Sequence, residues 1–91
     1  MVVLISRGVS DRSQASNQSR ALSILDARGV PYETVDGMDP SQRREREVLF
    51  GVSGVRGNYP QLFFVGGDGE AAYFGGYDRL EAVNEAGGLP R

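Results

Sequence analysis

The chain has 91 residues, enough for a single domain that we expect to span residues 1–91. Its formal net charge of −2 gives no electrostatic basis for a dedicated nucleic-acid binder. It contains no cysteine and no histidine, which excludes disulfides, a thiolate nucleophile, Cys-ligated zinc and a Ser-His-Asp triad. We therefore expect a protein that is not an enzyme and holds no metal.

No segment approaches the roughly 20 consecutive apolar residues that a membrane-spanning helix needs. The N-terminal apolar run, residues 2–5, is also too short for the core of a signal peptide. We therefore expect a cytoplasmic protein without a membrane partner.

The first part of the chain predicts a strand, a helix and a second strand. Residues 2–5 are a continuous apolar run, which is typical of a strand buried on both faces. After a polar stretch over residues 7–14, apolar residues at helical spacing predict a helix over about 14–28, which Gly29 ends. Residues 31–35 begin with proline and alternate with β-forming residues, which predicts a second strand.

The segment Asp39-Pro40-Ser41-Gln42 predicts the start of another helix. It places an acid at the N-cap, proline at the first helical position and glutamine at the third, so the first backbone N–H groups find acceptors. We expect this helix to run to about Phe50, with the charged residues 43–47 exposed. Its expected apolar edge consists of Val48, Leu49 and Val52. The glycines expected to break it are Gly51, Gly54 and Gly57.

Residues 61–65 and 70–74 predict an antiparallel hairpin, because the Gly-Gly-Asp-Gly turn over residues 66–69 supplies positive φ angles. Phe63 and Phe64 lie at adjacent positions of one strand and therefore point to opposite faces of the sheet. We expect helices to cover both faces.

A second capping box, Asp78 followed three residues later by Glu81, predicts the last helix. The pair Gly87-Gly88 is expected to end it. Its expected inner face consists of Leu80, Val83 and Ala86.

The predicted order is β-α-β-α-β-β-α. A helical crossover makes the first two strands parallel, and the hairpin adds an antiparallel pair. This is the thioredoxin-like order, an α/β fold with a four-stranded mixed sheet flanked by three helices. In that fold the functional edge would lie at Arg7–Ala15, Asn58–Pro60 and Gly75–Asp78.

The layout and the segment Gly75-Gly76-Tyr77-Asp78 resemble the glutaredoxins. Over nearly the whole chain, the sequence more closely resembles the SH3-domain-binding glutamic-acid-rich family, which consists of small glutaredoxin-like proteins that lack the full Cys-x-x-Cys centre. The segments that carry this resemblance are Ile5-Ser6, Ser16–Ser19, Ile24–Asp26, Tyr32–Asp36, Asn58–Phe63, Phe74–Asp78 and Glu81–Val83.

The resemblance implies a ligand groove. Pro60 is expected to follow a cis peptide bond, so that the backbone of Tyr59, next to Asn58, faces an extended peptide. At the start of the last helix, backbone N–H groups would bind a carboxylate such as that of glutathione. The residues expected there are Gly75, Gly76, Tyr77 and Asp78. The alternatives remain open that Pro60 only sets a turn and that Asp78 only caps its own helix.

The loop after the first strand carries further candidates. Arg7 and Arg12 are candidate contacts for an anion, with a solvated surface as the alternative. Ser10 and Ser13 lie near the place where the resemblance to glutaredoxins puts their cysteines, but a serine hydroxyl without a base cannot replace a thiolate.

Two departures from the family affect the functional prediction. The sequence lacks a Pro-x-x-Pro segment, and it ends at Gly88-Leu89-Pro90-Arg91 without the acidic tail of longer members. We predict a non-catalytic interaction module with a glutaredoxin-like groove, a protein partner and no cofactor. The alternative is a module that binds glutathione or a γ-glutamyl peptide and modulates glutaredoxins.

Overall fold

The computed structural model describes residues 1–87. In chain order its elements are β1 (Val2–Ile5), α1 (Arg12–Ala27), β2 (Glu33–Asp36), the 3₁₀ turn η1 (Pro40–Gln42), α2 (Arg43–Ser53), β3 (Gln61–Val65), β4 (Ala71–Gly75) and α3 (Tyr77–Glu85).

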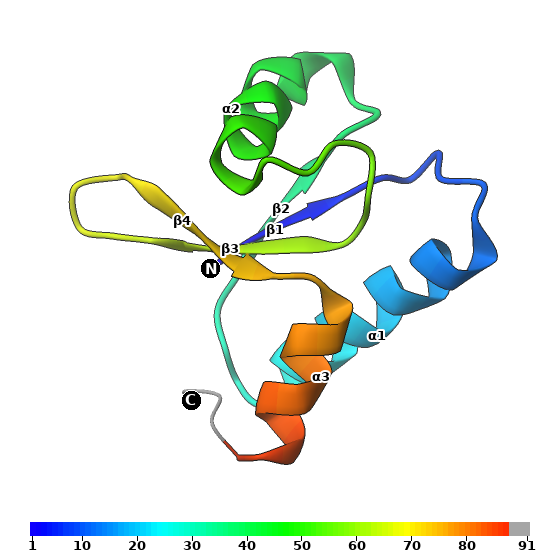
Figure 1. Ribbon diagram of the computed structural model, residues 1–91, viewed down its shortest axis with the longest axis vertical. Helices are drawn as coiled ribbons and strands as arrows, with labels where there is room; N and C mark the ends of the chain where they lie inside the picture. The colour runs from blue at the N-terminus through cyan, green and yellow to red at the C-terminus, as the bar shows by residue number, and fades with distance from the viewer. Residues whose placement is uncertain (88–91) are drawn as a thin grey trace.

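The strands form one four-stranded mixed sheet in the order β2-β1-β3-β4. Strand β1 pairs parallel with β2 and antiparallel with β3, and β3 pairs antiparallel with β4. Helices α1 and α3 cover one face, and α2 covers the other (Figure 1). The predicted thioredoxin-like fold is thereby confirmed.

The sheet separates two hydrophobic clusters, because successive strand residues point to opposite faces. Val3, Ile5 and Leu62 pack with Ala21 and Leu25 of α1 and Leu80 of α3. Leu4, Val35 and Phe63 pack with Leu49 and Phe50 of α2. The continuous apolar sequence of β1 therefore reflects burial on both sides.

Helix α1 begins two residues earlier than predicted. The Asp11 carboxylate caps it by accepting hydrogen bonds from the backbone N–H groups of Ser13 and Gln14, at 2.8 and 3.2 Å. The polar composition of this stretch concealed the cap. Arg12, predicted to lie in a loop, is therefore the first residue of the helix.

Asp39 caps the short η1 turn, and α2 follows from Arg43 and continues through Gly51. The prediction that Gly51 breaks this helix was therefore wrong; Gly54, with φ +73°, ends it. The predicted apolar edge was also partly wrong, because Val48 is 58% exposed and Val52 is 41% exposed, whereas Leu49 is buried.

The remaining differences concern strand ends and the last helix. Strand β2 begins at Glu33 rather than residue 31, and β4 is shifted by one residue to 71–75. Helix α3 begins at Tyr77 with Gly76 as its N-cap, so the predicted capping role of Asp78 was wrong. Ala86, predicted to lie on the inner face of this helix, is exposed. Of the two glycines expected to end the helix, Gly87 has φ +74°, and Gly88 lies outside the described residues.

The aromatic side chains of β3 are covered unequally. Phe63 is fully buried under α2, as expected. Phe64 on the other face remains 45% exposed and has only an edge-on contact with Phe74, at 5.3 Å between ring centroids. The expectation that helices cover both rings was therefore wrong for Phe64.

Candidate functional site

A groove of about 400 Å³ lies where the start of α1, the segment before β3 and the start of α3 meet. It contains most of the residues predicted for the ligand groove, although their segments are far apart in sequence. The residues that line it are Gln14, Asn17, Asn58, Tyr59, Pro60, Tyr73, Gly76, Tyr77, Asp78 and Arg79. The groove is thus a product of the fold and not of one continuous motif.

The Tyr59–Pro60 peptide bond is cis. The Tyr59 N–H, the group expected to face an extended peptide, donates a hydrogen bond to Oε1 of Gln14 at 2.9 Å. The Tyr59 ring packs against Phe50 on the α2 side, with centroids 6.3 Å apart. A Cβ atom at Gly37 would lie 2.9 Å from the Tyr59 hydroxyl, so that side chain points away from α1 and α3. Tyr59 therefore offers the groove its backbone more than its phenol.

Gln61 holds the segment before Tyr59 in place. Its Nε2 donates to the carbonyl oxygens of Val55 and Asn58, both at 2.8 Å, and the side chain is fully buried. Its Oε1 is the one buried side-chain polar atom among residues 1–87 without a hydrogen-bond partner. Burying the Gln61 Oε1 without a hydrogen-bond donor costs free energy. The two hydrogen bonds donated by Nε2 offset this cost.

Helix α3 begins at the groove without a side-chain cap: no side chain accepts from its first N–H groups. Asp78 is exposed in its first turn. The Arg79 guanidinium lies over the Phe74 ring, 5.3 Å from its centroid. The Tyr77 hydroxyl donates to Glu81, and this hydrogen bond raises the pKa of Tyr77 above its ordinary value.

Gly75 does not line the groove, although it was predicted as a site residue. It is buried and has φ +148°, and a Cβ atom there would lie 2.6 Å from Cδ and 2.9 Å from Cβ of Arg79. Because Gly75 has no side chain, the first turn of α3 packs directly against the end of β4.

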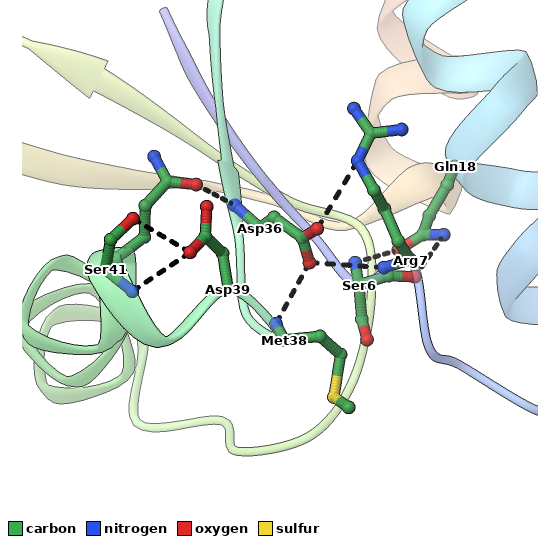
Figure 2. Close-up of polar contacts among 8 residues, drawn as sticks. Ser6, Arg7, Gln18, Asp36, Met38, Asp39 and Ser41 are labelled. Carbon is green, nitrogen blue, oxygen red and sulfur yellow. Dashed lines mark hydrogen bonds and ion pairs between the residues drawn. The ribbon is translucent and has the colours of Figure 1, made fainter.

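The two candidate anion contacts do not line the groove. The Arg7 Nε lies 3.3 Å from the Asp36 carboxylate, which also accepts from the backbone N–H groups of Arg7 and Met38 (Figure 2). Asp36 in this way ties the loop after β1 to the loop after β2. Arg12 is exposed in the first turn of α1. Their role as anion contacts therefore stays a prediction, made for residues outside the groove.

The Asp39 carboxylate accepts hydrogen bonds from the Ser41 hydroxyl at 2.8 Å and its N–H at 2.9 Å (Figure 2), which hold the Asp39 pKa below its ordinary value. Because the pKa is lower in the folded state, this carboxylate stabilises the fold above its unfolded pKa of about 4. That contribution is lost as the pH falls through the folded pKa. We expect Asp39→Asn, which keeps an acceptor but cannot titrate, to have a lower urea midpoint than wild type at pH 7, and the difference to shrink as the pH falls below about 4 toward the lowered folded pKa. A constant difference would contradict this assignment.

Four lining residues were not named as site residues by the sequence analysis: Gln14, which lies within the predicted segment Arg7–Ala15, and Asn17, Tyr73 and Arg79, which lie outside the predicted segments. A signal for the first two exists, because Asp11 and Gln14 have the spacing of a capping box and Asn17 follows one turn later. No comparable local signal marks Tyr73 or Arg79, which the antiparallel hairpin and α3 bring to the groove.

Within the described residues, no three His, Cys, Asp or Glu side chains gather in a way that would hold a metal ion. Among residues 1–87, none of the helices has both the length and the apolar character needed to cross a membrane.

No family profile matches the chain. Over 94 aligned positions it is 31% identical to a Drosophila melanogaster protein named SH3 domain-binding glutamic acid-rich protein homolog. The alignment covers 91% of this chain and 56% of that protein, so the chain spans little more than half the length of this relative. The similarity confirms the resemblance inferred from the sequence motifs.

Proposed function

Because the chain is a relative of the SH3 domain-binding glutamic acid-rich proteins, we propose that it is a non-catalytic module that binds an extended segment of a protein partner in the groove beside Tyr59 and Pro60. The observation that carries this proposal is the groove itself. It brings together a backbone edge at residues 58–60, the amide side chains of Gln14 and Asn17, and the start of α3.

The chemistry of the groove supports binding without catalysis. With no cysteine and no histidine in the chain, neither a thiolate nor an imidazole base is available. The side chains that line the groove are amides, phenols, one proline ring, one carboxylate and one guanidinium. These groups are well suited to hydrogen-bonding a peptide main chain and packing against its side chains.

The Drosophila relative is named for SH3 binding, but the four prolines of this chain do not form a Pro-x-x-Pro segment. A polyproline II ligand needs such a segment to be preformed. We therefore place the binding function in the groove, where this chain receives a segment of its partner, and not in a proline-rich segment offered to an SH3 domain.

A second candidate ligand is glutathione or a γ-glutamyl peptide. It is favoured by the start of α3, where no side chain caps the first N–H groups and Arg79 lines the groove. The N-terminus of a helix attracts negative charge, so a ligand carboxylate would be stabilised there.

The test is a titration followed by backbone amide shifts, with two probes: a peptide selected on this protein from a library of linear peptides, and reduced glutathione. We expect the peptide to shift the backbone amide signals within residues 58–61 and 75–78. Asp78→Ala should weaken its binding about tenfold, the effect of losing a charge-assisted hydrogen bond, while the melting temperature stays within a few degrees of wild type.

Arg43→Ala is the control, since Arg43 is exposed on α2 outside the groove. It should leave the Kd unchanged. Loss of binding in Arg43→Ala but not in Asp78→Ala would place the function on the helix surface. Saturable shifts with glutathione alone would favour the second candidate, and turnover in an insulin-reduction assay would contradict a non-catalytic module.

A further inference from the structure

Strands β1 and β3 separate next to the groove. Their antiparallel ladder runs from Val2 opposite Phe63 to Leu4 opposite Gln61. Continuing that register would place Ser6 opposite Tyr59, but their backbones do not pair with each other. Two glutamines of α1, Gln14 and Gln18, provide the hydrogen bonds there instead.

Gln18 pairs with both backbone polar groups of Ser6. Its Oε1 accepts from the Ser6 N–H, and its Nε2 donates to the Ser6 carbonyl at 3.1 Å (Figure 2). This two-point contact reproduces the pattern that a neighbouring strand would make. Ser6 is only 3% exposed, so Gln18 closes a buried strand end.

Gln14, one helical turn earlier, makes a contact of a different kind. Its Oε1 accepts from the Tyr59 N–H at 2.9 Å, and the Gln14 side chain itself lines the groove. Asp11 fixes the backbone of Gln14 by capping the helix at that position. The amide carbonyl thus lies where the main-chain carbonyl of an extended peptide would pair with Tyr59.

We propose that Gln14 is an internal competitor for the groove: its side-chain carbonyl occupies the Tyr59 N–H, and a peptide strand that binds beside Tyr59 must displace it. This inference rests on the proposed peptide-binding function. Gln18 stays in place when the peptide binds, because its partners are buried. Gln14 therefore sets the affinity of the groove by competing for one hydrogen bond.

The test compares two variants of equal side-chain length and similar volume, Gln14→Met and Gln18→Met, with the selected peptide as the probe. Gln14→Met leaves the Tyr59 N–H for the peptide, so we expect its Kd to be about two- to tenfold lower than that of wild type, the range expected for one neutral hydrogen bond. In wild type, peptide binding should shift the side-chain amide signals of Gln14 but not those of Gln18.

Gln18→Met should lower the urea midpoint, because it leaves the buried N–H of Ser6 without a partner and its carbonyl with only the long 3.5 Å bond from the Val9 N–H, and should not tighten binding. If Gln14 were only a structural support, Gln14→Met would loosen the segment before Pro60 and weaken binding. An unchanged or higher Kd in Gln14→Met, or tighter binding in both variants, would overturn the proposal. If the peptide shifts the amide signals of residues 58–61 and binds wild type and Gln14→Met with equal affinity, the competition alone is overturned. If the peptide binds neither protein, the proposed function is overturned as well.

Discussion

Replacing Phe63 by alanine is expected to lower the free energy of unfolding by about 3–5 kcal/mol. Phe63 is fully buried between the sheet and α2, in the cluster that contains Leu4, Leu49 and Phe50. Its ring also contacts Tyr73 across the hairpin, at 5.4 Å between centroids. Small domains have unfolding free energies of about 5–15 kcal/mol, so this one change would remove a large share. Urea denaturation measures the loss.

The neighbouring Phe64→Ala is the matched control, because the same side chain is removed from the other face of the same strand. Phe64 is 45% exposed and has an edge-on contact with Phe74, so the loss should be about 0.5–1.5 kcal/mol. Equal losses in the two variants would mean that the α2 cluster contributes less to stability than its burial indicates.

The fold was predictable because its main signals are local and periodic. The apolar run of β1, the glycine-rich turn between β3 and β4, and the glycine that ends α1 are each read within a few residues. The errors arose where tertiary contacts decide the outcome. The Gln42 side chain, expected to cap the second helix, instead accepts a hydrogen bond from the backbone N–H of Asp36 at 2.9 Å. Helix α2 continues past Gly51 and is capped by Gly54.

The candidate site was predictable in its segments but not in its contacts. The cluster at residues 58–60 and the glycine pair before α3 were found by resemblance, and the fold brings residues 58–60 and Gly76, but not Gly75, to one groove. The hydrogen bonds from the Tyr59 N–H to Gln14 and from the Arg7 N–H to Asp36 join residues 45 and 29 positions apart. Such pairings depend on how helices and loops pack on the sheet, so local patterns do not reveal them.

Gly75→Ala should lower the free energy of unfolding by about 1–3 kcal/mol, because an alanine is strained at φ +148°. The new Cβ would also lie 2.9 Å from Cβ of Arg79, an atom that cannot swing away without a shift of the first turn of α3. We therefore expect this variant to alter the amide signals of residues 76–80 and to lose peptide binding together with stability. Urea denaturation and amide spectra measure the two effects.

The adjacent Gly76→Ala provides the decisive comparison. Gly76 has φ −95°, which any residue adopts, and a Cβ there would make an ordinary contact of 3.6 Å with the Pro60 carbonyl oxygen. Its stability should fall by about 1 kcal/mol, because glycine is preferred over alanine at an N-cap but no steric strain is added. The added methyl group lies against Pro60 in the groove, so the Kd of the peptide should rise although the fold is kept. Loss of stability in Gly75→Ala and loss of binding alone in Gly76→Ala would divide the glycine pair into one residue that the fold requires and one that faces the ligand.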